Sequence, residues 1–173
     1  SNAVTGDFNT AVGALSLYNA EGVANTNTAI GYRAGYQVTT ASGSVLIGHQ
    51  AGDNITTASG SVFIGVDAGG NVQTGNMNIG IGYNAFHNAA TGDHNIAIGV
   101  NAAVTISTGN KNIAMGYDAL GDMTAGTNNI ALGYESMNAL QGNDGGFGNY
   151  NIAIGTDAMG SVEGYHTGTE IDG

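Results

Sequence analysis

The sequence predicts an all-β fold, a parallel β-solenoid, and three observations lead to this. A glycine that follows an aliphatic residue or Met recurs at spacings of 18, then six times 17, then 22 residues. Two larger residues separated by a usually small one precede most of these glycines, which is the period of two of a β-strand. The chain of 173 residues contains no Pro, which fits a backbone whose N–H groups pair with neighbouring strands. These anchoring glycines are Gly13, Gly31, Gly48, Gly65, Gly82, Gly99, Gly116, Gly133 and Gly155.

The residues before each anchoring glycine, which we number zero, predict a short strand. Positions minus three and minus one carry large or β-branched residues such as Ile96 and Ile98, and minus two is usually small, as in Ala97. We expect the large pair to point into the coil and the small residue to face outward, where another subunit can approach closely. Leu46 and Phe63 at minus two then make that outward side bulkier in two repeats.

An amide recurs at minus four, before the strand. Stacked Asn side chains hydrogen-bond along an axis in cross-β structures, so we expect a ladder. Asn occupies this position in seven repeats and Ser in two: Asn9, Asn27, Ser44, Ser61, Asn78, Asn95, Asn112, Asn129 and Asn151.

The segment after the glycine predicts a second short strand, for example residues 83–86, whose third residue is always Ala or Ser. We expect this small residue to point inward. A polar loop then leads to Thr-Gly, where we expect glycines such as Gly75 and Gly92 to supply a positive φ. Each unit is thus interpreted as strand, glycine turn, strand and polar turn, and about nine coils of 17 residues form a rod of about 40 Å.

Domain boundaries follow from the repeat. Residues 1–5 are a lead-in, of which Ser1, Asn2 and Ala3 have the composition of a tag remnant. Residues 6–160 form the solenoid, with an insertion near 142–148 that accounts for the 22-residue step. Residues 161–173 are predicted to be a polar tail or connector.

Composition excludes several functions. Thirteen acidic and two basic residues give a formal net charge of −11, which disfavours binding to nucleic acid. No apolar run approaches the length of a membrane helix, so we expect no membrane insertion. Without Cys, disulfides and thiolate metal sites are absent. Nothing in the sequence indicates a cofactor.

The repeat resembles two groups of proteins. Residues 112–120, Asn-Ile-Ala-Met-Gly-Tyr-Asp-Ala-Leu, are similar to units of bacteriophage tail-fibre proteins, and the Asn-Ile-Ala-Ile-Gly core resembles the heads of trimeric autotransporter adhesins. The resemblance implies a left-handed β-roll assembled as a homotrimer, in a fibre that contacts a cell surface. The unit is longer than the adhesin unit, and neither a heptad stalk nor an anchor is visible, which favours the tail-fibre group.

Candidate receptor contacts lie in two places. The insertion and the residues after it offer Asn143, Asp144, Phe147 and Tyr150, because insertions in solenoids often carry binding. Position plus one carries Tyr117 stacked over Tyr134, with Tyr32 and Tyr83 in the same rank. An exposed aromatic strip binds sugar or protein, but we favour a subunit contact for it.

Three carboxylates at plus two, Asp118, Glu135 and Asp157, are weak candidates for a cation site or a glycosidase pair. A solvated charged edge is the simpler interpretation. A threonine rank at minus eight suggests ice binding, against which we favour capping of the turn. The histidines occupy four unrelated positions, which argues against a metal site. No Gly-x-Ser-x-Gly motif is present, so no enzyme is predicted.

These observations predict a structural and host-attachment segment of a homotrimeric phage tail fibre that binds a cell-surface glycan or protein, located in the virion. A bacterial adhesin head at the cell surface is the first alternative. An ice-binding solenoid and a surface-glycan hydrolase are the others.

Overall fold

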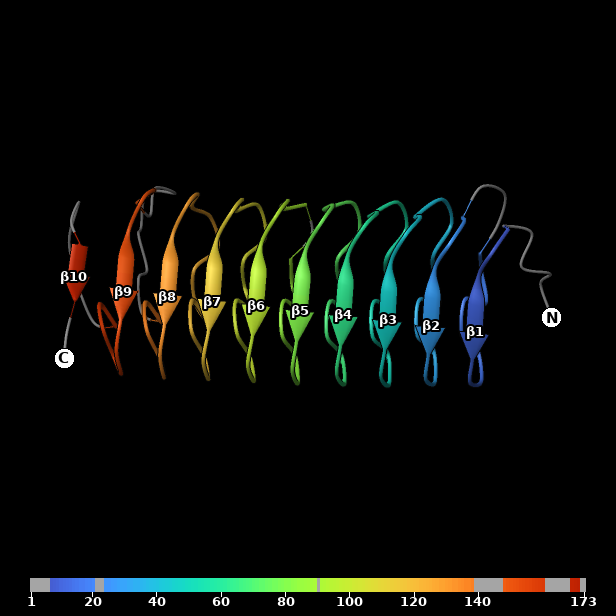
Figure 1. Cartoon of the computed structure of the whole chain (residues 1–173), viewed down its shortest axis with the longest axis horizontal. Helices are drawn as coiled ribbons and strands as arrows, with labels where there is room; N and C mark the ends of the chain where they lie inside the picture. Colours follow the sequence, from blue (N-terminus) through green and yellow to red (C-terminus); the bar gives the residue numbers. More distant parts are fainter. Residues whose placement is uncertain (1–6, 21–23, 90, 139–147, 161–168, 172–173) are drawn as a thin grey trace.

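The computed structural model describes residues 7–20, 24–89, 91–138, 148–160 and 169–171. Within these residues it is all-β, a solenoid with one parallel sheet of ten strands in chain order and no helix that could cross a membrane (Figure 1). The strands are β1 (Thr10–Val12), β2 (Thr28–Ile30), β3 (Val45–Ile47), β4 (Val62–Ile64), β5 (Ile79–Ile81), β6 (Ile96–Ile98), β7 (Ile113–Met115), β8 (Ile130–Leu132), β9 (Ile152–Ile154) and β10 (Thr169–Ile171).

The sheet joins equivalent residues of successive repeats, as predicted. Ala114 pairs with Ala131 across β7 and β8, and Ile130 pairs with Ile152 across β8 and β9. The 22-residue step therefore leaves the register unchanged. Thr169 pairs with Ile152, so the segment predicted as a polar tail or connector contains a tenth strand, β10.

The segment after each glycine is not a strand, which corrects the two-strand interpretation. In the repeat of Gly31, the Ala34 N–H donates to the Gly31 carbonyl at 3.4 Å and the Tyr36 N–H to the Arg33 carbonyl at 3.2 Å. Arg33 and Gly35 have φ of 56° and 63°. These are two overlapping turns with a left-handed third residue. Ala34 at plus three and Gly35 at plus four are both buried, whereas neighbouring residues of a strand point to opposite faces.

The strand faces are the reverse of those predicted. Residues at minus two point inward: Ala97, Ala114 and Ala131 are fully buried, whereas Met115 at minus one is 42% exposed. A coil built from one strand and a run of turns has a narrow interior, so the sheet contributes small side chains to it. Leu46 and Phe63 therefore enlarge the core and not an outward face, because both are fully buried.

Core volume is shared between minus two and plus four. Where minus two is Ala114, plus four is the buried Leu120. Where minus two is Leu46, plus four is Gly52, and a Cβ on this glycine would lie 2.8 Å from Leu46 Cδ2. In these repeats the interior stays close-packed whether the strand or the turn supplies the large side chain.

Two ranks of glycine are required for different reasons. Each anchoring glycine has a positive φ, for example 139° at Gly116, and a Cβ there would collide with the carbonyl of Gly133 in the next repeat. The Thr-Gly glycine Gly75 does not have the predicted positive φ. A Cβ on Gly75 would instead collide with the Gly92 carbonyl, so close approach between coils selects glycine at this corner.

The predicted asparagine ladder is present and buried. The Asn112 side-chain oxygen accepts the Asn129 N–H at 3.0 Å, and the Asn112 Nδ2 donates to the Gly126 carbonyl at 2.9 Å. Ser44 and Ser61 continue the ladder through their hydroxyls, with the Ser61 N–H donating to Ser44 Oγ at 3.4 Å. The ladder satisfies backbone groups that the strands leave unpaired.

Candidate functional site

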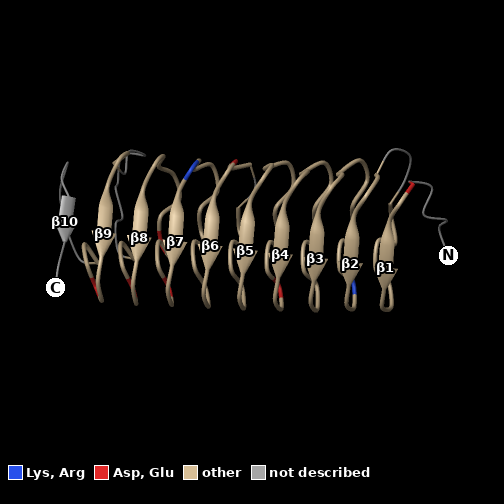
Figure 2. Ribbon diagram, in the orientation of Figure 1, with Lys and Arg blue, Asp and Glu red and all other residues tan. Residues whose placement is uncertain are grey.

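The outward side of the sheet is a largely apolar surface without Asp, Glu, Lys or Arg on β1–β9. We call positions minus three, minus one and plus one the outer sheet face. No charged residue lies on β1–β9, and Figure 2 shows the charged residues away from these strands. Ile113, Met115 and Tyr117 represent the three positions in one repeat, with Met115 and Tyr117 more than 40% exposed. A continuous exposed apolar surface of this kind marks an interaction site.

The aromatic rank at plus one lies on this face. The rings of Tyr117 and Tyr134 are 5.2 Å apart and 10° from parallel, which confirms the predicted stacking. Tyr32 stacks on His49 at 5.3 Å. Both Tyr117 and Tyr134 remain more than 40% exposed, so one side of the stack is open to a partner.

The hydroxyl of Tyr134 has a raised pKa. Its hydrogen bond with the Glu135 carboxylate is the largest cause, followed by charge repulsion from Glu135. Tyr117 and Asp118 add smaller contributions. The tyrosine therefore remains a neutral phenol to a higher pH than an isolated one.

The carboxylate rank at plus two has a backbone explanation. Asp118, Glu135 and Asp157 have φ of 50°, 52° and 55°, and every other described repeat also has a positive φ at this position. Asn and Asp adopt this conformation more readily than most residues. Among the described residues, no three His, Asp or Glu side chains are grouped closely enough to hold a metal ion, so these three do not form such a site.

Of the four candidate contacts in and after the insertion, Tyr150 alone lies among the described residues. Asn143, Asp144 and Phe147 lie outside the described residues. Tyr150 is 75% exposed, has a φ of 67°, and donates its N–H to the Thr127 carbonyl at 3.1 Å. It occupies minus five of a regular repeat, so Tyr150 belongs to the solenoid surface and is an exposed aromatic residue there.

The threonine rank at minus eight does not generally cap the turn, contrary to expectation. Thr40, Thr57 and Thr74 are exposed, and their hydroxyls bond to no described residue. The side chain at minus nine is the main cap of the turn. For example, the Thr56 hydroxyl donates to the Gln73 carbonyl at 3.0 Å. The Thr91 hydroxyl is an exception, donating to the Ser107 carbonyl at 3.3 Å.

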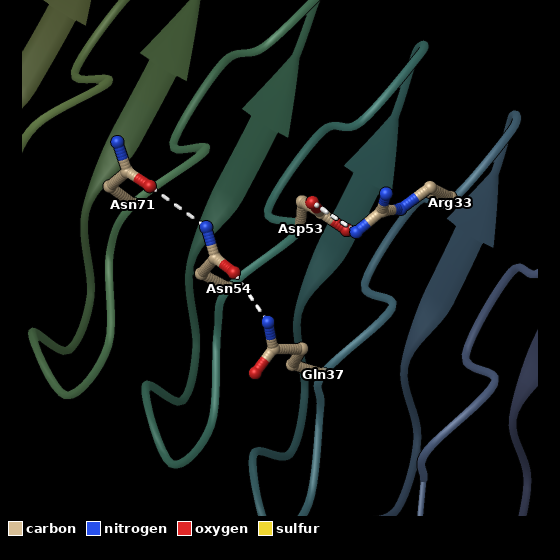
Figure 3. A network of polar contacts seen from close by, with 5 residues as sticks. All are labelled: Arg33, Gln37, Asp53, Asn54 and Asn71. Atoms are coloured by element: carbon tan, nitrogen blue, oxygen red, sulfur yellow. Dashed lines mark hydrogen bonds and ion pairs between the residues drawn. The ribbon is translucent and has the colours of Figure 1, made fainter.

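A second amide ladder at plus six was missed by the sequence reasoning (Figure 3). Gln37 Nε2 donates to Asn54 Oδ1 at 2.6 Å, and Asn54 Nδ2 donates to Asn71 Oδ1 at 2.8 Å. Asn71 Nδ2 then donates to Asn88 Oδ1 at 3.0 Å. We call these four residues the amide row. The sequence feature that could have predicted this ladder is an amide side chain at plus six in successive repeats.

An ion pair lies beside this row. Arg33 Nη2 is 3.0 Å from Asp53 Oδ2, and the Arg33 guanidinium stacks on the Tyr36 ring, 4.5 Å from its centroid. The Asp53 side chain is nearly buried. The pair neutralises a carboxylate that directly precedes Asn54.

Comparisons of the chain with protein-family models, curated proteins and solved structures found no match.

Proposed function

We propose that this chain is a shaft and attachment segment of a homotrimeric bacteriophage tail fibre that binds a bacterial cell surface. The outer sheet face is the observation that supports this most. It is uncharged over β1–β9 in a chain with a net charge of −11 and only moderately hydrophobic composition. Such a face is stabilised when another molecule covers it.

Identical copies are the partners that suit this face. It extends along the stack as three ranks of mostly apolar residues, interrupted by Thr10, Thr28, His49 and Thr156. Copies side by side in the same register place equivalent ranks at equal heights and bury Ile113, Met115 and Tyr117 against their counterparts. A closed symmetric assembly leaves none of these faces uncovered. The trimer and its left-handed coil follow the resemblance of the repeat to fibre and adhesin proteins.

A rigid shaft fits the rest of the structure. The stack of strands, the buried asparagine ladder and the close-approaching glycines fix each coil on the next. Ten strands at about 4.8 Å spacing span about 40 Å. A rod of this kind can hold a receptor-binding surface away from a particle.

Attachment is tested by binding the labelled, folded chain to a panel of bacterial strains and counting labelled cells by flow cytometry. We expect strain-dependent binding that excess unlabelled chain competes away. Absence of competed binding on every strain would contradict attachment by this segment. A bacterial adhesin head is the alternative with the same fold, and binding to animal epithelial cells in place of bacteria would favour it.

A further inference from the structure

We propose that the amide row and the threonine rank beside it form a binding strip for a neutral polysaccharide chain that lies along the fibre axis. The strip consists of Gln37, Asn54 and Asn71, the first three residues of the amide row, and of Thr40, Thr57 and Thr74, each three residues further along the chain. The inference rests on the proposed attachment function and adds to it the ligand class and the contact surface.

The strip has hydrogen-bond donors and acceptors that the bonds within the fold leave unused. Asn54 uses one N–H to bond Asn71 and one oxygen lone pair to accept from Gln37. An amide has two N–H groups and two lone pairs, so one of each is left. The exposed hydroxyls of Thr57 and Thr74 bond to no described residue. Paired donors and acceptors of this kind are what sugar hydroxyl groups bind.

The fold itself does not explain the amides of this row. Asparagines at minus four are buried and bond to the backbone, but the row from Gln37 to Asn88 bonds only within itself. The backbone is already satisfied, since the Asn54 N–H donates to the Gly70 carbonyl at 3.0 Å. Thr105 occupies the same position two repeats beyond Asn71. The pairs are part-buried or exposed, so water competes for them and their contribution to stability is modest.

The charge of the strip favours a neutral ligand. Residues 37–40, 54–57 and 71–74 contain no charged side chain, and Arg33 neutralises Asp53. An acidic glycan would find no cation in the strip and would be repelled by the net charge of −11. A basic peptide would find no carboxylate there.

The spacing favours a linear polymer. One amide and one threonine recur per coil, at the strand spacing of about 4.8 Å. A chain of repeating sugars placed along the axis can contact several coils at once, and weak contacts then add up through multivalency.

The test measures binding of the full chain to an array of neutral and acidic glycans, before and after the change Asn54→Thr/Asn71→Thr. Thr is the residue present at 105, so we expect an unchanged melting temperature. We expect the wild type to bind at least one neutral polysaccharide, and the double variant to bind it about tenfold more weakly, as a loss of about 1.4 kcal/mol implies. The change Lys111→Gln, at an exposed position outside both the strip and the outer sheet face, is the control and should leave glycan binding unchanged.

Four results would overturn the inference. Binding to no neutral glycan, or equal binding by the double variant, would place receptor contact elsewhere, while strain-dependent cell binding would still support the attachment function. A lower melting temperature with unchanged glycan binding would make the row a structural ladder. Thermal hysteresis of the wild type, lost in Thr57→Val, would assign the strip to ice.

Discussion

Phe63 fills the space that Gly69 leaves empty. A Cβ on Gly69 would lie 2.5 Å from Cγ of Phe63, and Phe63 is fully buried with its ring 6.2 Å from that of Phe86 in the next repeat. Strand and turn thus share one core volume in this coil. The first prediction follows from this relationship.

Changing Phe63 to Ala should lower the free energy of unfolding by about 3–5 kcal/mol, because it leaves a cavity in a close-packed core. Adding Gly69→Leu should recover part of this loss, since Leu120 occupies the equivalent turn position opposite Ala114 at a φ of 53°. Gly69→Leu alone should destabilise by overpacking. Urea unfolding of the three variants checks this. A double variant no more stable than Phe63→Ala would contradict the shared volume.

Changing Asn112 to Ala should cost about 1–3 kcal/mol or more, because the buried Asn129 N–H and Gly126 carbonyl each lose a partner. Asn112→Ser is the matched control, since Ser44 and Ser61 serve the same position. We expect it to cost less, as measured by thermal unfolding. Equal losses would show that the ladder contributes through volume and not through hydrogen bonds.

Changing Arg33 to Ala should destabilise the folded chain at pH 7 by about 1–3 kcal/mol, because the nearly buried Asp53 carboxylate loses its partner. The double change Arg33→Ala/Asp53→Asn removes the charge and should restore most of the stability. Chemical denaturation at pH 7 measures both. If the double variant is no more stable than Arg33→Ala, the loss comes from the contact of Arg33 with Tyr36.

Changing Glu135 to Gln should lower the pKa of Tyr134 toward its ordinary value of 10.0, since the carboxylate is the main cause of the rise. Ultraviolet titration of the phenolate, with Tyr134→Phe to identify the signal, measures the shift. Because the folded pKa is raised, any associated stability is present below pH 10 and is lost as the pH rises through the folded value. An unchanged pKa in Glu135→Gln would contradict the contact.

The repeat, the parallel register and the buried asparagine ladder were predictable from the sequence, because a 17-residue period and a ladder both require equivalent residues to stack. The strand faces were not. Ile and Val usually point inward, but here the interior has room only for residues such as Ala114 beside Leu120. The sequence feature that indicates the true orientation is a large residue at minus two paired with a glycine at plus four. Phe63 with Gly69 and Leu46 with Gly52 are the two examples.

The turns after each glycine were mistaken for a strand for a related reason. Asp118 and Asn101 at plus two hold a positive φ, whereas the sequence pattern around them alternates as a strand does. Among the candidate contacts, the stacking of Tyr117 on Tyr134 was predicted. The amide row was missed because Asn and Gln in polar segments usually indicate loops.

Sedimentation equilibrium of the wild type and of Ile113→Lys tests the central claim, that copies of this chain cover the outer sheet face. We expect a wild-type mass near three times 17.2 kDa. Ile113→Lys should dissociate it toward one chain, because it places a cation on that face, whereas Thr74→Lys on another surface should not. A wild type that sediments as a single chain, or an Ile113→Lys variant with the wild-type mass, would contradict the account.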